Sequence, residues 1–114
     1  MRCTWFPLVA AVTAMIFAAP ARADVDADFN ERLHSYGVYG PRDYNAWLGK
    51  IMCKRLDTSV DADAQQSARF VARNLPRTYG TGQSWQFVAA AIDFYCPEKA
   101  VVLERVINSQ EGKP

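Results

Sequence analysis

Two cysteines, Cys53 and Cys96, most constrain how this chain can fold, because the third, Cys3, lies in a segment that we expect to be removed. Disulfides form and persist in proteins that are exported from the cytoplasm. Two cysteines allow a single intramolecular pairing. The chain-entropy model gives about 4 kcal/mol for closing a loop of this length. We therefore expect a disulfide between Cys53 and Cys96, with two buried free thiols as the alternative.

The N-terminal 23 residues have the pattern of a secretory signal peptide. Arg2 provides a short positive region, an uncharged apolar run follows over residues 5–19, and residues 21–23 form a small-x-small cleavage site. The alternative is a membrane anchor, but a spanning helix needs about 20 apolar residues. We therefore expect cleavage after Ala23 and a protein that is secreted or stays in the cell envelope.

The mature chain, residues 24–114, is long enough for one domain with a single core. Its formal charge is −1, because the signal peptide removes Arg2 and Arg22 and no acidic residue. Nucleic-acid binding requires a basic stripe and a high pI, and anionic membrane surfaces attract clustered basic residues. The neutral balance therefore predicts no nucleic-acid partner and no stable membrane insertion after the signal peptide is removed.

Hydrophobic residues recur every three or four positions along the mature chain, which is the period of an amphipathic helix. The first predicted helix covers residues 26–36 and ends at Gly37, because glycine favours the left-handed conformation found at helix C-termini. The second covers residues 43–56, with Asp43 as its cap. Five side chains are predicted on its apolar face, namely Tyr44, Trp47, Leu48, Ile51 and Met52.

A third helix is predicted over residues 61–74, ahead of the helix-breaking Pro76. Thr58 and Asp61 precede it with capping-box-like spacing. The fourth helix, with Thr81 or Ser84 as its cap, is apolar around much of its circumference. It is therefore predicted to be the central helix of the domain.

The fourth helix ends at Cys96, and Pro97 is suited to the first position of a further helix. This extension covers residues 98–108, with Val102, Val106 and Ile107 as candidates for its inner face. The predicted fold class is therefore all-α, a small orthogonal or bundle-like domain of four to five helices. Its one disulfide would join the C-terminal ends of the second and fourth helices.

Several short motifs occur in a characteristic order. An acidic start leads into Asp28-Phe29 and Leu33, then Gly37-Val38, then a helix reaching Cys53 and Leu56. The most specific motif is an alanine-rich helix that ends in Tyr95-Cys96-Pro97. Over residues 26–97 the chain resembles the small secreted mycobacterial proteins grouped as domain of unknown function family 732. The resemblance implies an exported helical domain with one disulfide and no established biochemical activity.

The sequence contains no catalytic constellation. His34 is the only histidine, and its neighbour Ser35 points about 100° away on a helix. The acidic residues cluster at helix starts, where capping and the helix dipole explain them. Cys53 and Cys96 are too far apart for a redox Cys-x-x-Cys motif, and with one histidine they cannot complete a metal site. We expect no enzyme activity, no metal and no cofactor.

Two groups of residues are candidates for ligand binding. Arg69, Arg73 and Arg77 recur every four residues, and a glycine-containing loop, residues 79–82, leads into a helix N-terminus. This combination suits a phosphate or a carboxylate, although an arginine stripe is also typical of a solvated helix face. Tyr39 belongs to an aromatic group with Tyr36, Tyr44 and Trp47. These aromatics form either a surface for a partner or a core from which only Tyr39 is exposed.

The main functional hypothesis is a non-enzymatic extracytoplasmic module that binds an envelope or extracellular protein. The binding surface would be the aromatic group or the loop over residues 77–83. The alternative is a carrier of a small molecule or lipid, with a cavity between the alanine-lined third helix and the fourth helix. An outward aromatic surface over a filled core would favour the first hypothesis, and a continuous apolar cavity would favour the second.

Overall fold

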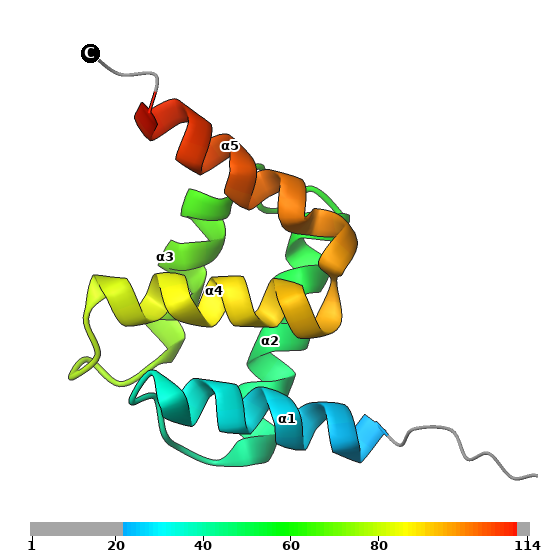
Figure 1. Ribbon diagram of the computed structural model, residues 1–114, viewed down its shortest axis with the longest axis vertical. Helices are drawn as coiled ribbons and strands as arrows, with labels where there is room; N and C mark the ends of the chain where they lie inside the picture. Colours follow the sequence, from blue (N-terminus) through cyan, green and yellow to red (C-terminus); the bar gives the residue numbers. More distant parts are fainter. Residues whose placement is uncertain (1–21, 112–114) are drawn as a thin grey trace, which may run out of the picture.

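The computed structural model describes residues 22–111, so nearly all of the predicted signal peptide lies outside the described residues. In that range the chain forms five α-helices, one short 3₁₀ helix and no strand, which confirms the predicted all-α fold (Figure 1). The elements are α1 (Arg22–Ser35), α2 (Arg42–Asp57), α3 (Ala64–Asn74), α4 (Thr81–Tyr95), η1 (Pro97–Lys99) and α5 (Ala100–Glu111).

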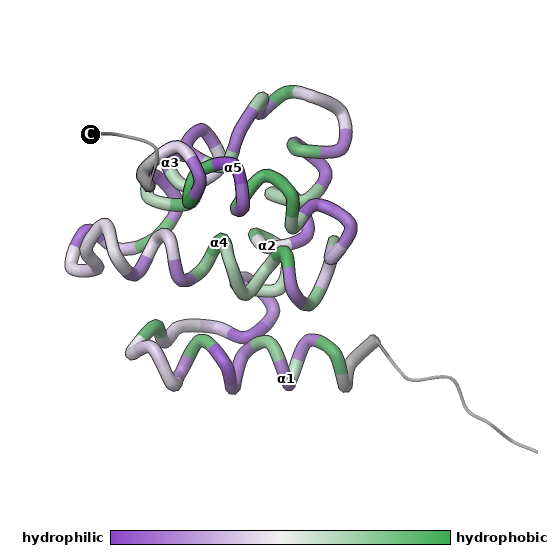
Figure 2. Tube along the Cα trace, turned by 45° about the horizontal axis from the view of Figure 1, so that its top comes forward, coloured by the Kyte–Doolittle hydropathy of each residue, from purple (hydrophilic) through white to green (hydrophobic). Residues whose placement is uncertain are grey.

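Helix α4 is the centre of the domain, as its apolar composition predicts, because it contacts every other helix. Helix α1 lies beside it and runs in the opposite direction (Figures 1 and 2). Helices α2 and α3 cross α4 on another side, and α5 packs on the ends of α3 and α4. Hydrophobic residues recur along α1 between hydrophilic ones, as expected for a helix with one buried face (Figure 2).

The core between α1, α2 and α4 is built around Phe29, whose side chain is fully buried. Its ring makes edge contacts with Phe87, Phe94 and Tyr95 of α4, at centroid distances of 5.4, 6.0 and 4.9 Å. Such edge-to-face pairs add to the stabilisation that comes from buried area alone. Other fully buried side chains fill the remaining space, among them Leu33, Val38, Leu48, Met52, Val71 and Val88.

The predicted disulfide is confirmed. Cys53 in the last turns of α2 is bonded to Cys96, which directly follows α4, and their Cα atoms are 5.9 Å apart. Both cysteines are buried. The bond therefore joins the C-terminal ends of α2 and α4, as the sequence predicts.

The predicted end of the first helix is also confirmed. Gly37 has a φ of 81°, its N–H donates to the His34 carbonyl, and the N–H of Val38 donates to the Leu33 carbonyl. These are the two hydrogen bonds of a Schellman motif. The helix begins at Arg22, four residues before the predicted start at Asp26, so the predicted cleavage site lies in its first turn.

The prediction for α2 is wrong in two respects. Its N-cap is Pro41, and Asp43 lies inside the first turn with its carboxylate against Arg42. Tyr44 and Trp47 are exposed, so they do not belong to the buried face. Leu48 and Met52 are buried as predicted, and smaller residues complete the buried face, because α1 and α4 pack close to the α2 backbone. Its members are Asn45, Ala46, Leu48, Gly49, Met52, Cys53 and Leu56.

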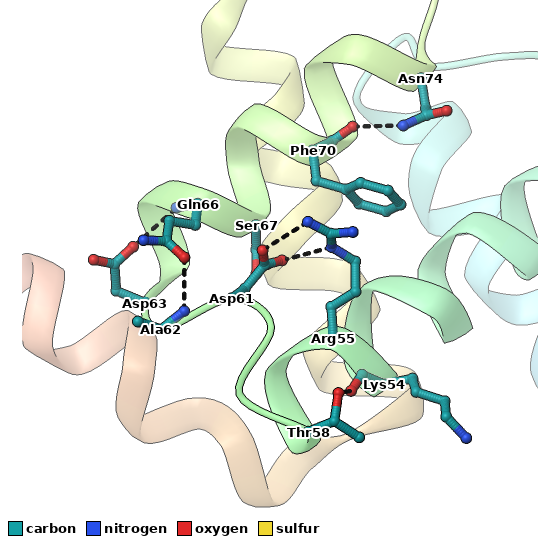
Figure 3. Close-up of polar contacts among 10 residues, drawn as sticks. All are labelled: Lys54, Arg55, Thr58, Asp61, Ala62, Asp63, Gln66, Ser67, Phe70 and Asn74. Atoms are coloured by element: carbon teal, nitrogen blue, oxygen red, sulfur yellow. Dashed lines mark hydrogen bonds and ion pairs between the residues drawn. The ribbon is translucent and has the colours of Figure 1, made fainter.

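The predicted start of the third helix at Asp61 is wrong. Helix α3 begins at Ala64, and its N-cap is Asp63, which accepts a hydrogen bond from the N–H of Gln66 at 2.9 Å (Figure 3). Thr58 takes no part in a capping box, because its hydroxyl donates to the carbonyl of Lys54 at the end of α2. Two aspartates lie close together in sequence, and tertiary contacts decide which of them caps the helix.

Asp61 instead joins α2 to α3 through a buried carboxylate (Figure 3). Arg55 donates to it twice, from Nε at 3.1 Å and Nη2 at 3.0 Å, and the Ser67 hydroxyl donates at 3.2 Å. The Arg55 guanidinium also lies over the Phe70 ring, 4.1 Å from its centroid. A paired and hydrogen-bonded carboxylate is the form in which a buried charge is tolerated.

The remaining caps and the C-terminal helix also differ in part from the prediction. Neither Thr81 nor Ser84 caps α4. Its N-cap is Gly80, whose N–H donates to Oε1 of Gln83 at 3.0 Å. Pro97 begins the 3₁₀ helix η1, and α5 follows. Of the three inner-face candidates on α5, Val102 is buried and Val106 partly buried, whereas Ile107 is exposed.

Gly49 is the position at which α2 comes closest to its neighbours. A Cβ at Gly49 would lie 3.1 Å from the Tyr95 ring and 3.2 Å from the Phe29 ring. Gly49→Ala should therefore lower the free energy of unfolding by about 1–2 kcal/mol, even though alanine favours helix by about 1 kcal/mol. Gly82→Ala is the matched control, because a Cβ there has open space. Urea denaturation should show it unchanged or stabilised, and equal effects of the two variants would contradict this packing.

Candidate functional site

A hollow of about 420 Å³ lies where the loop after α1 and the start of α2 meet the end of α3. The size is within the range of small-ligand sites. Aromatic, polar and basic side chains share its lining. The lining residues are Tyr39, Gly40, Pro41, Tyr44, Asn45, Arg73, Asn74, Leu75 and Pro76.

Side-chain hydrogen bonds hold two walls of the hollow in place. The Tyr44 hydroxyl donates to the backbone carbonyl of Asn74 at 2.9 Å, which links α2 to the end of α3. The Tyr79 hydroxyl accepts from the N–H of Tyr39 at 2.9 Å, which fixes the loop after α1. These two bonds link residues from three segments of the chain around the hollow.

Asn45 is the most unusual residue of the hollow. It is only 2% exposed, and its Nδ2 atom is buried without a hydrogen-bond partner among the described residues. The atom faces Gly40, where a Cβ would lie 3.6 Å from it. Buried polar atoms in folded proteins nearly always have a partner. An unpaired donor at this position is therefore unusual.

Sequence reasoning missed Asn45, although the signal was present. Asn45, Leu48 and Met52 share one helical face by their spacing of three and four. A polar residue in line with apolar core positions is expected to be buried. The three-four spacing of Tyr44 and Trp47 predicted burial of the adjacent face instead.

The rim of the hollow continues into an exposed aromatic surface, which comprises Tyr39, Tyr44 and Trp47. These side chains are 57%, 38% and 51% exposed. The Tyr44 and Trp47 rings contact each other at a centroid distance of 5.7 Å, and Tyr39 lies 5.0 Å from the ring of His34. Of the three aromatic residues that the core alternative would bury, namely Tyr36, Tyr44 and Trp47, Tyr36 alone packs against the core.

The structure separates the three arginines of the predicted stripe, all of which are exposed. Arg73 lines the hollow together with Tyr39. Arg69 lines a different groove, of about 300 Å³, between α3 and α4. Arg77 lies in the loop beyond Pro76 and lines neither. Two of the four predicted ligand-binding residues, Tyr39 and Arg73, are thus brought together, and they face the start of α2.

A second polar cluster lies beside the disulfide, where Asp26 accepts from the Tyr95 hydroxyl at 2.6 Å and from Lys50 at 3.2 Å. Burial alone would raise the pKa of Asp26, but the hydrogen bonds from Tyr95 and Lys50 outweigh it and lower that pKa. Burial, followed by the hydrogen bond to Asp26, raises the pKa of Tyr95. Tyr95 therefore stays a hydrogen-bond donor that links α4 to α1. The cluster loses its stabilising effect as the pH falls through the lowered pKa of Asp26, and also as the pH rises above the ordinary pKa of tyrosine, because the unfolded chain releases that proton more readily.

Within residues 22–111, no group of three or more histidine, cysteine or acidic side chains is arranged to hold a metal ion. In the same range, no helix has the length and apolar character needed to cross a membrane. His34 is exposed, and its ring contacts the Tyr39 ring.

The fold and the site define a small all-α domain with one disulfide and a surface hollow rimmed by aromatic side chains. The model of a family described as "Protein of unknown function (DUF732)" matches residues 24–98, and this chain belongs to that family. The resemblance seen in the short motifs is thereby confirmed. Helix α5 lies beyond the matched residues.

Relatives of this chain include two uncharacterized proteins, one from each of two strains of Mycobacterium tuberculosis. Each is 58% identical to it over 95 residues, which cover 82% of this chain and 85% of the relative. No solved structure matches the chain. The family and these relatives have no described biochemical activity from which a site could be transferred.

Proposed function

We propose that the protein is a non-enzymatic extracytoplasmic module that binds an envelope or extracellular protein through its aromatic surface. The observation that carries this proposal is the exposure of Tyr39, Tyr44 and Trp47 on adjoining segments. Aromatic residues are enriched in the buried centres of protein interfaces. Their large apolar area and few rotatable bonds give much contact at a low entropic cost.

Within the fold these three residues make surface contacts: the Tyr44 hydroxyl donates to Asn74, the Tyr44 and Trp47 rings contact each other, and the Tyr39 ring contacts His34. Trp47 is half exposed, whereas Leu48 and Met52 of the same helix are buried in the core. Covering the Trp47 ring with a partner would remove apolar area from water, which is favourable. A partner protein supplies such a cover.

The test is capture of partners from envelope extract by the oxidised protein, with quantitative mass spectrometry of wild type and variants. A specific partner should fall about tenfold with Trp47→Ala, the loss that is typical of an interface residue worth more than 1 kcal/mol. Ile107→Ala is the matched control, since it removes an exposed apolar side chain from α5. Circular dichroism should show all variants folded. Equal capture by wild type, Trp47→Ala and Tyr39→Ala would refute the surface assignment.

The groove between α3 and α4 supports a second candidate, the carriage of a small apolar molecule. It lies where the alanine-lined face of α3 meets α4, and Ala68, Ala72 and Trp85 line it together with Arg69. Its volume of about 300 Å³ is at the lower end of ligand sites, and it opens to solvent. Quenching of tryptophan fluorescence by a bound fatty acid, lost in Trp85→Phe and retained in Trp47→Phe, would favour this candidate.

A further inference from the structure

We propose that the hollow beside the aromatic surface binds a carboxylate, namely the C-terminal carboxylate of the partner polypeptide. The identity of the partner as a protein rests on the function proposed above. The carboxylate site itself is inferred from the donors that the hollow presents. Three kinds of donor converge there, and they come from different parts of the fold.

The first donor is the side-chain amide of Asn45. Its Nδ2 is buried and unpartnered among the described residues, so it has lost its hydration without gaining a hydrogen bond. This loss is unfavourable in the free protein. An oxygen atom placed between Asn45 and Gly40 would restore the missing bond. Gly40 presents no side chain to Asn45, and a Cβ there would already be in van der Waals contact with Nδ2, at 3.6 Å.

The second donor group is the N-terminus of α2, a helix of 16 residues. Its N-cap residue is Pro41, which provides no side-chain cap. Asn45 is the first residue of α2 whose backbone N–H donates a hydrogen bond to the carbonyl four residues earlier, that of Pro41, at 3.0 Å. The amides of the preceding turn therefore lack intrahelical acceptors, and the helix dipole favours an anion at this end.

The third donor is Arg73, which lines the hollow from α3. Its guanidinium makes no ion pair with another described residue. Arginine presents paired N–H groups that match a carboxylate. The nearby carboxylate of Asp43 is exposed and pairs with Arg42.

The rest of the lining is apolar, with Pro41, Leu75 and Pro76 beside the Tyr39 and Tyr44 rings. A polypeptide C-terminus with an apolar last residue presents a carboxylate next to a hydrophobic side chain. It therefore matches both the hydrogen-bond donors and the apolar lining of the hollow. Recognition of C-terminal carboxylates by backbone amides is a recurring mode of peptide binding. From the hollow, the partner chain would continue across Tyr44 to Trp47, which lies against the Tyr44 ring.

The experiment is a ¹⁵N NMR titration of the oxidised protein with acetyl-Ala-Leu, which has a free carboxylate, and with its C-terminal amide. The free-carboxylate peptide should cause saturable shifts of the Asn45 side-chain amide and of the backbone amides of Arg42 to Tyr44. The amide peptide should cause none. Equal binding of the two peptides, or no saturable shift with either at millimolar concentration, would overturn the proposal.

Matched variants locate the site. Arg73→Gln should weaken binding about tenfold, the effect of losing a charged hydrogen-bond donor. Arg69→Gln, one turn earlier on the same helix, should leave binding unchanged because Arg69 lines the other groove. Both positions are exposed, so neither variant should affect folding. Equal weakening by both variants would show a diffuse charge effect and contradict a site in the hollow.

Two further ligands distinguish the source of the anion. Acetyl-Asp-Leu-amide carries only a side-chain carboxylate, and inorganic phosphate carries no apolar group. Stronger binding of either one than of acetyl-Ala-Leu would overturn the assignment to a polypeptide C-terminus. The peptide titration and the partner-capture test have separate outcomes. If Trp47→Ala loses capture but the protein binds no peptide, only the carboxylate site is refuted. Peptide binding without Trp47-dependent capture would refute only the proposed docking surface.

Discussion

Replacing Cys53 and Cys96 together with alanine should lower the free energy of unfolding by about 4 kcal/mol, because the unfolded chain is no longer closed into a loop. The two cysteines are 43 positions apart. Alanine is preferable to serine at both positions, because both are buried and a hydroxyl there would need a partner. Domains of this size have total stabilities of about 5–15 kcal/mol, so the loss is a large part of the whole.

Urea denaturation of the oxidised protein and of the double variant measures this loss. The reduced wild-type protein is the internal control and should unfold close to the double variant, since both lack the cross-link. The slope of the transition should be larger for both, because an open chain exposes more surface on unfolding. An unchanged midpoint in the variant would show that the helix ends are held together by other contacts.

Asp61→Ala should lower the free energy of unfolding by about 3 kcal/mol. Breaking a buried ion pair from one side costs about 3–5 kcal/mol, because the other charge stays buried. The lower end applies here, since the Arg55 side chain is 28% exposed and regains some hydration. Ser67 is fully buried and also loses its acceptor. The change should appear as an earlier thermal transition of the oxidised protein.

Asp57→Ala is the matched control for Asp61→Ala. Asp57 also forms an ion pair, with Lys99 at 3.6 Å, but its side chain is exposed. Exposed pairs contribute at most about 1 kcal/mol, so this variant should be near neutral. The double variant Arg55→Met/Asp61→Ala should be less destabilised than the sum of the two single variants, because no unpaired charge remains. Additive losses would contradict a direct interaction between Arg55 and Asp61.

The sequence predicts the helices well where local chemistry is unambiguous. Gly37 ends α1 because its φ of 81° suits a residue without a side chain. The start of a helix is predicted less well where two nearby residues are equally suited to cap it. Asp61 and Asp63 can each begin a helix, and Asp63 is the cap because Arg55 and Ser67 engage Asp61. Arg55 lies on the preceding helix, so no pattern within the third helix reveals this choice.

The sequence pattern of α2 alone also does not predict which of its faces is buried. Hydrophobicity alone favours burial of Trp47 over Asn45. The packed structure reverses this order, because Gly49 lets the Phe29 and Tyr95 rings approach the helix backbone and thereby selects the face to which Asn45 belongs. The aromatic residues are left on the outside, where the proposed binding surface lies.

Among the candidate site residues, the sequence identified Tyr39 and Arg73 separately and gave no reason to pair them. By itself the sequence determined the helical fold class and the disulfide, because helix periodicity and cysteine chemistry act through residue type and short-range spacing. Only the tertiary structure decided that Tyr39, Asn45 and Arg73 share one hollow. The reason is that the burial of Asn45 and the position of Arg73 depend on how α2 and α3 pack together, which is set by contacts between residues far apart in the chain.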